Sequence, residues 1–281
     1  LGEGEMMLIG GVMPRLFAGG LGLAFVVLVA VASAQPPVIE IDAESGLPTA
    51  LDIDNELAAR IAAEVERGLE ASMKTAPGRE TLGFYGVEID VQRDGGLEVT
   101  ETITAYALGK RIKRGIYREF SLLNVERYQP SNPYDVISVK RDGAPLRNWF
   151  TERGGSFYQI YMGSKNRYLK TGRWYTYEIK YRVPKAILQY EDHDLLYWNA
   201  IPFHWAFPIR SADIVVRFPE GFVTRDIEIK SGRFGDKHNY VNAVWQRPAD
   251  NVVRVTASDL SAKRGITLMT VSYTHLTAAD D

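Results

Sequence analysis

The chain has 281 residues, a formal net charge of −2 at pH 7 and no cysteine. The near-neutral balance argues against nucleic acid as an electrostatic partner, and the missing cysteines exclude disulfides, cysteine metal ligands and cysteine nucleophiles. Because 46% of the residues are hydrophobic and 11% are aromatic, a packed core has to supply the stability.

The N-terminal part has the organisation of a secretory leader. Met13-Pro14-Arg15 supplies a positive start, residues 16–31 carry no charge, and Ala32-Ser33-Ala34 places small residues in an A-x-A arrangement. The apolar run is shorter than the roughly 20 residues that a membrane span needs. We therefore predict a leader and signal peptide over residues 1–34 and export to the extracytoplasmic side of the cell membrane, with an uncleaved N-terminal anchor as the alternative.

Residues 35–81 are predicted to form a linker and one amphipathic helix. Residues 35–49 are rich in proline and acidic residues, which indicates an extended linker. From Leu51 to Met73, apolar residues recur near helical spacing with charges between them, and Pro77-Gly78 follows the end of this pattern. The helix serves either as an exposed connection or as a partner-binding element.

From Leu82 onward the hydrophobic period is two, as in β-strands. Apolar and polar residues alternate over residues 84–108 on both sides of the Asp94-Gly95-Gly96 turn, which is a strong hairpin signal. Further short strands are predicted over residues 136–141, 157–162, 173–183, 212–218, 227–230, 243–246, 252–257 and 265–271. The expected fold is mostly β: an antiparallel β-sandwich over residues 82–272, with one N-terminal amphipathic helix.

Glu101 interrupts the apolar face of the second hairpin strand. It shares that face with Leu97, Val99 and Ile103, so the pattern directs a carboxylate towards the core. Either the strand lies at an edge where the carboxylate reaches water, or the carboxylate pairs with a buried cation such as Arg118. Because arginine pairs well with carboxylates, we predict a structural pair of Glu101 and Arg118.

Five cations lie within the nine residues from 110 to 118, flanked or interrupted by glycines at positions 109 and 115. Such a segment either binds an anion, for example a lipid headgroup or an acidic glycan, or forms a solvated loop. The candidate binding residues are Lys110, Arg111, Lys113, Arg114 and Arg118.

Residues 190–199 place four polar groups before a group of aromatic residues. Glu191, Asp192, His193 and Asp194 are of the types that bind divalent metals or act as acids and bases. Consecutive strand residues point to alternate faces, however, and the sequence contains no HExxH motif. We therefore predict no metal site, no catalytic residue and no cofactor.

Residues 201–209 are dense in aromatic side chains. Such a segment is either a platform on which sugars stack or part of the core between two sheets. Trp198, His204 and Trp205 are the candidate binding residues of this region.

Several of these segments together resemble the N-terminal region of the DUF2207 family of predicted bacterial membrane proteins. The resemblance begins with residues 93–103 (RDGGLEVTETI) and residues 115–118 (GIYR). It continues through residues 197–209, a strand that ends at Phe218-Pro219-Glu220-Gly221, and Asp259-Leu260. It covers roughly residues 82–272.

The resemblance implies an extracytoplasmic β-sandwich held by transmembrane helices further along the chain. No apolar run of about 20 residues follows residue 272, and residues 273–281 read as a non-native tail, so we expect a fragment that lacks its C-terminal membrane anchor. The leading interpretation is a non-enzymatic module of an envelope membrane protein with an anionic or protein partner. The alternative is a glycan-binding or hydrolase domain that uses Glu101, His193, Asp194 and His204.

Overall fold

The computed structural model describes residues 50–121, 134–155, 157–222, 224–233, 236, 243–273 and 276. The predicted leader, the linker of residues 35–49 and most of the predicted tail lie outside the described residues. In chain order the elements are α1 (Ala50–Met73), β1 (Thr81–Val91), β2 (Leu97–Ala107), β3 (Gly115–Ser121), β4 (Asp135–Arg141), β5 (Ala144–Pro145), β6 (Trp149–Arg153), β7 (Phe157–Gly163), β8 (Arg173–Val183), β9 (Ile187–Gln189), β10 (Asp194–Ile201), β11 (Ile209–Arg217), β12 (Asp226–Gly232), β13 (Ala243–Ala249), β14 (Val252–Leu260) and β15 (Gly265–Ser272).

The mostly-β class, the helix and the first hairpin are confirmed. The helix α1 ends at Met73, as the apolar pattern predicted. Strands β1 and β2 pair antiparallel around a turn in which Gly95 has a φ of 78°, a conformation that favours glycine. The ten predicted strands occur with small shifts at their ends, and β3, β5, β6, β9 and β10 are additional.

The strands form three sheets among the described residues. The large sheet has the order β13-β14-β11-β1-β2-β8-β4-β5, and the two smaller sheets have the orders β12-β15-β10-β9 and β3-β7-β6. The strands pair mainly antiparallel, as expected, and one described pair departs from this: β1 and β11 are parallel at the centre of the large sheet. A parallel pair needs a long crossover connection, and here the chain from β2 to β10 provides it.

The main core lies between the large sheet and the two smaller sheets. Val99 and Ile103 of β2 belong to the same buried cluster as Ile160 of β7 and Leu268 of β15, so both smaller sheets pack on one face of the large sheet. This arrangement places β2 in the middle of a sheet and under a cover, which decides the environment of Glu101.

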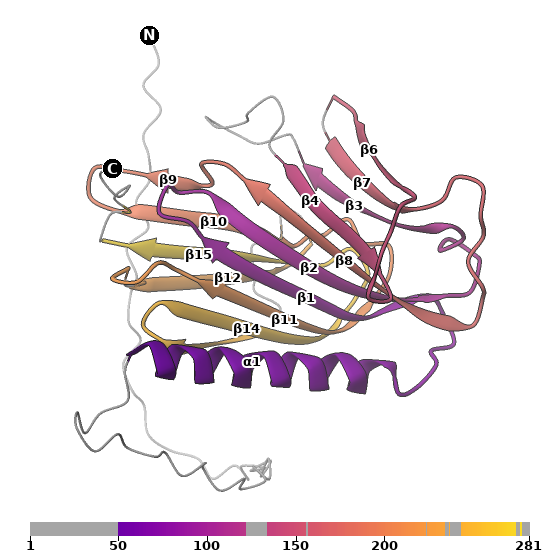
Figure 1. Ribbon diagram of the computed structural model, residues 1–281, viewed down its shortest axis with the longest axis horizontal. Helices are drawn as coiled ribbons and strands as arrows, with labels where there is room; N and C mark the ends of the chain where they lie inside the picture. Colours follow the sequence, from indigo (N-terminus) through magenta and orange to yellow (C-terminus); the bar gives the residue numbers. More distant parts are fainter. Residues whose placement is uncertain are drawn as a thin grey trace, which may run out of the picture. The chain divides into compact units, whose positions relative to one another are not determined.

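The helix α1 covers part of the opposite face of the large sheet (Figure 1). Ile61 of α1 is buried against Val215 of β11 and Val252 of β14 in a second, smaller apolar cluster. In the described part of the chain, no helix is both long and apolar enough to cross a membrane.

Candidate functional site

A deeply buried ion pair links β2 and β3. Arg118 Nε lies 3.0 Å from Glu101 Oε1 and 2.8 Å from Oε2, and it donates to both oxygens. Glu101 is completely buried and Arg118 nearly so. The possibility that Glu101 lies at an edge where it reaches water is therefore wrong: β2 runs between β1 and β8, and β3 covers it.

Two tyrosines complete the shell around the Glu101 carboxylate. Tyr85 donates its hydroxyl to Oε2 and Tyr181 donates to Oε1, each at 2.6 Å. Tyr85 on β1 pairs with Ile103 and Tyr181 on β8 pairs with Val99, so both hydroxyls approach Glu101 diagonally from the two flanking strands. The period-two pattern of three adjacent strands thus builds this site.

The electrostatics of this cluster favour a permanent ion pair. Burial lowers the pKa of the Arg118 guanidinium, but the charge and hydrogen bond of Glu101, together with Tyr85 and Tyr181, outweigh burial and raise that pKa. Burial, with the charge of Glu101 added, raises the pKa of Tyr85 and Tyr181 well above the ordinary value. The guanidinium also lies 4.1 Å over the Phe120 ring. Arg118 is therefore enclosed, and its binding capacity is used inside the fold.

The basic segment after β2 is organised around another carboxylate, which the sequence reasoning missed. Glu80 is buried and accepts hydrogen bonds from the backbone N–H groups of Leu108, Lys110, Arg111 and Ile112, at 2.8 to 3.2 Å. The backbone thus curls around an internal anion, and the side chain of Ile112 fills the core. The side chains of Lys110, Arg111, Lys113 and Arg114 are exposed.

A second loop, which was not singled out from the sequence, lies against this basic segment. Leu169 N donates to the carbonyl of Lys113 at 2.8 Å, and Gly172 N donates to the carbonyl of Ala107 at 2.7 Å. The guanidinium of Arg114 lies 4.6 Å over the Tyr168 ring. The run of lysine and arginine in residues 164–173, without any acidic residue, was the available sequence signal.

The aromatic residues after β10 belong mainly to the core. Trp205 is buried and meets Tyr85 edge-on with ring centroids 5.9 Å apart. Trp198 is partly buried against the main core. His204 is exposed, and its Nδ1 lies 3.8 Å from a carboxylate oxygen of Glu119. Of the three candidates, His204 is the most exposed.

The acidic and histidine groups around β9 and β10 do not converge on one place. His193 Nδ1 lies 2.7 Å from Asp192 Oδ1, and its ring stacks on Tyr190. Asp194 is buried and accepts a hydrogen bond from Leu276 N. His193 precedes β10 and His204 follows it, so a strand about 23 Å long separates the two histidines. No cluster of three or more metal-ligating side chains occurs among the described residues.

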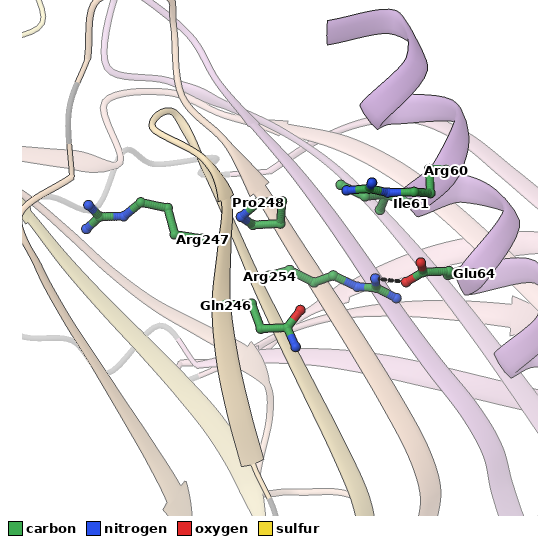
Figure 2. A pocket seen from close by; sticks show the side chains of 7 residues that line it. All are labelled: Arg60, Ile61, Glu64, Gln246, Arg247, Pro248 and Arg254. Atoms are coloured by element: carbon green, nitrogen blue, oxygen red, sulfur yellow. Dashed lines mark hydrogen bonds and ion pairs between the residues drawn. The ribbon is translucent and has the colours of Figure 1, made fainter. Parts of the chain in front are cut away.

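A cavity of about 300 Å³ lies between α1 and strands β13 and β14 (Figure 2). Arg254 on its wall donates to both oxygens of Asp213, at 3.0 and 2.6 Å, and also pairs with Glu64 of the helix. The hydrogen bonds to Asp213 raise the pKa of Arg254 despite its partial burial. Arg254 thus fastens α1 to the sheet.

These features define a mostly-β domain in which Glu80, Glu101, Arg118 and Asp194 have partners inside the fold and exposed cations gather on two loops. The chain belongs to the DUF2207 family, since the model for the family, described as "Predicted membrane protein (DUF2207) N-terminal domain", matches residues 82–271. This match confirms the resemblance seen in residues 93–103 and 115–118.

One curated relative is the uncharacterized protein YciQ of Escherichia coli (strain K12). It is 32% identical to this chain over 166 residues, which cover 57% of this chain and 26% of the relative. The chain thus spans about a quarter of the length of that relative.

Some solved structures superpose on part of this chain. A zinc metallopeptidase of the M1 class from Deinococcus radiodurans superposes with a TM-score of 0.39 and 14% identity over 72% of this chain and 44% of that chain. Native yeast LTA4 hydrolase gives a TM-score of 0.41 and 11% identity over 70% of this chain and 30% of that chain. Both scores are low.

Proposed function

We propose that this chain is a non-enzymatic extracytoplasmic module of an envelope membrane protein and that it acts by binding an anionic partner. The description of the family as a predicted membrane protein supports the membrane association in this proposal. The leader-like residues 1–34 and the small residues at 32–34 support export. The whole protein would extend beyond this chain, in keeping with the greater length of the curated relative.

One observation carries the binding role: the buried ionic groups have internal partners, whereas the cations of the basic segment face solvent. Arg118 is held by Glu101, and the backbone around Lys110 is held by Glu80. The side chains of Lys110, Arg111 and Lys113 have no described carboxylate within ion-pair distance and are exposed. Such side chains are suited to an external anion.

The hydrolase alternative has weaker support. General acid–base chemistry requires groups within hydrogen-bond reach of one substrate atom. The four candidates occupy different environments: Glu101 is enclosed with Arg118, Asp194 bonds a backbone amide, and the histidines lie at opposite ends of β10.

The placement can be tested with alkaline phosphatase fused after residue 281, because this reporter folds only outside the cytoplasm. We expect high reporter activity from the fusion and a loss of at least about tenfold when Val26→Arg and Leu28→Arg interrupt the apolar run. Val38→Arg and Ile39→Arg in the linker are the matched control and should leave activity unchanged. Activity that is low from the start, or insensitive to the first pair, would contradict the placement.

A further inference from the structure

Two loops at one end of the three-stranded sheet form a single cationic surface, which we call the double loop: residues 108–114 and 164–173. The first leads into β3 and the second leaves β7, so the antiparallel pairing of β3 and β7 brings them together. Ser164 N and Leu169 N donate to backbone carbonyls of the first loop, and Gly172 N donates to Ala107 at its base. The two loops are therefore held in a fixed relation.

The double loop concentrates positive charge to an extent that the net charge of the chain conceals. It carries eight lysine and arginine residues and no acidic residue, and since the whole chain has a net charge of −2, the remainder is left at −10. Arg173 lies 4.0 Å from Asp142. The other seven have no described carboxylate within ion-pair distance; they are Lys110, Arg111, Lys113, Arg114, Lys165, Arg167 and Lys170.

The internal anion Glu80 keeps this charge directed outwards. Its carboxylate accepts four backbone N–H groups, which fixes the curl of residues 108–112 before any external partner arrives. Gly109, with a φ of 74°, takes a conformation that favours glycine, and a Cβ there would meet Thr171 of the second loop. A preformed surface of this kind loses little conformational entropy when it binds.

A row of aromatic rings crosses the outer face of the three-stranded sheet beside the double loop. Tyr117 of β3, Tyr161 of β7 and Phe150 of β6 lie directly opposite one another in register. Phe150 and Tyr161 stack face to face, 4.7 Å apart with 6° between their planes, and Lys165 lies 4.4 Å over Phe150. The row therefore continues into the cations of the second loop.

The packing of these rings distinguishes between two kinds of anionic partner. Sugars stack on free ring faces, but in this row Phe150 and Tyr161 cover one face of each other, and Lys165 lies over Phe150. Exposed tyrosines next to lysine and arginine are typical of the interface of a bilayer. Tyr117 and Tyr168, exposed by 47% and 65%, are such tyrosines.

From these observations we infer that the double loop and the adjacent aromatic row bind the phosphate headgroups of an anionic phospholipid bilayer. The inference rests on the proposed function, in which the domain lies outside the membrane that anchors the rest of the protein. The cations would contact headgroup phosphates, and the rings of Tyr117 and Tyr168 would enter the headgroup layer.

The test measures binding of the full chain to vesicles of pure phosphatidylcholine and of an equimolar mixture with phosphatidylglycerol. Because an apolar leader inserts into both, the ratio of the two affinities is the readout. We expect at least about a hundredfold tighter binding to the anionic vesicles, weakened by added salt. The triple variant K110Q/K113Q/K170Q should weaken that binding by about fivefold per lysine removed.

A matched control, R60Q/R67Q/K74Q, removes two exposed cations from α1 and one from the residue that follows it, and it should change the affinity by less than about twofold. A second loop variant, K165Q/R167Q, keeps the test independent of the first loop. Equal binding to both vesicles, or equal losses in the loop and helix variants, would overturn the inference. Heparin binding at the same lysines, with no preference of the chain for anionic vesicles, would overturn it in favour of an acidic glycan.

The two proposals fail in distinguishable ways. A chain that binds anionic vesicles but yields no external phosphatase activity contradicts the placement alone. A chain that is exported but ignores anionic lipid contradicts the bilayer partner alone.

Discussion

Replacing Glu101 with alanine removes the acceptor that satisfies three buried donors at once. Arg118 Nε, the Tyr85 hydroxyl and the Tyr181 hydroxyl all lie within 3.0 Å of its two oxygens. In the variant the guanidinium keeps its positive charge, because arginine is not deprotonated in proteins. The substitution therefore leaves an uncompensated charge in the core.

The magnitude follows from this uncompensated charge. Removal of one partner from a buried ion pair costs about 3–5 kcal/mol. Each hydroxyl without a partner adds about 1–3 kcal/mol unless water enters the space left by the carboxylate, which is polar enough to hold water. We expect Glu101→Ala to lower the free energy of unfolding by at least 3–5 kcal/mol, a large share of the roughly 5–15 kcal/mol that stabilises a domain.

Urea unfolding monitored by tryptophan fluorescence measures this change, since Trp205 packs on Tyr85 beside the site. The matched control is Glu98→Ala on the same strand. Glu98 lies on the opposite, solvated face and pairs with Lys180 and Arg182. Its loss should cost no more than about 1 kcal/mol.

A double-mutant cycle separates the ion pair from the loss of packing. The loss of stability in the double variant Glu101→Ala/Arg118→Ala should be about 2–3 kcal/mol smaller than the sum of the losses in the two single variants, because the double variant leaves no unpaired buried charge. A loss below about 0.5 kcal/mol for Glu101→Ala, or a cycle without coupling, would refute the view that these two charges stabilise the core as a pair.

Three further changes test other parts of the fold. Gly115→Ala should lower the free energy of unfolding in urea by more than about 3 kcal/mol, because its Cβ would lie 2.1 Å from a carbonyl oxygen of β7. The control Gly143→Ala, at a positive φ but with open space around it, should cost about 1–2 kcal/mol. Similar losses in the two variants would contradict the role of the close approach at Gly115. Glu80→Ala should cost about 2 kcal/mol or more and speed hydrogen exchange of the amides of residues 108–112, and unchanged exchange would contradict the anchoring role. Burial raises the pKa of Tyr134 from its ordinary value near 10 to about 12. The neutral phenol therefore contributes fully to the free energy of unfolding below about pH 10, and this contribution is lost towards pH 12 at about 1.4 kcal/mol per pH unit. Tyr134→Phe should reduce this dependence of stability on pH, and an unchanged dependence would exclude Tyr134 as its cause.

The parts of the fold that local pattern decides could be predicted from the sequence. The β1–β2 hairpin follows from alternation on both sides of Gly95, and α1 follows from apolar spacing that ends before Pro77. Glu101 was recognisable as unusual because a strand with a fixed register leaves no choice about which face a side chain occupies.

The remaining parts depend on contacts between distant segments. The strand β3 was not predicted, because Arg118 and Glu119 interrupt its apolar residues and make the segment resemble a charged loop. The burial of Arg118 depends on its pairing with Glu101 on another strand, which the local sequence does not show. The parallel pairing of β1 and β11 joins segments more than a hundred residues apart, and no local signal records it. The role of Glu80 likewise depends on a loop 28 to 32 residues further on.

The net charge of the chain likewise does not show where its charged residues lie. The net charge of −2 argued against a polyanionic partner, yet eight cations lie on two adjoining loops. Attraction at a surface acts within about 8–10 Å at physiological salt, so a nearby partner responds to the loops rather than to the total. The case against nucleic acid therefore rests on the proposed export of the chain, and the case for an anionic bilayer rests on the local arrangement of cations and exposed tyrosines. If that arrangement governs binding, its salt dependence should follow the number of loop cations and should not change when the same number is removed from α1 and the residue after it.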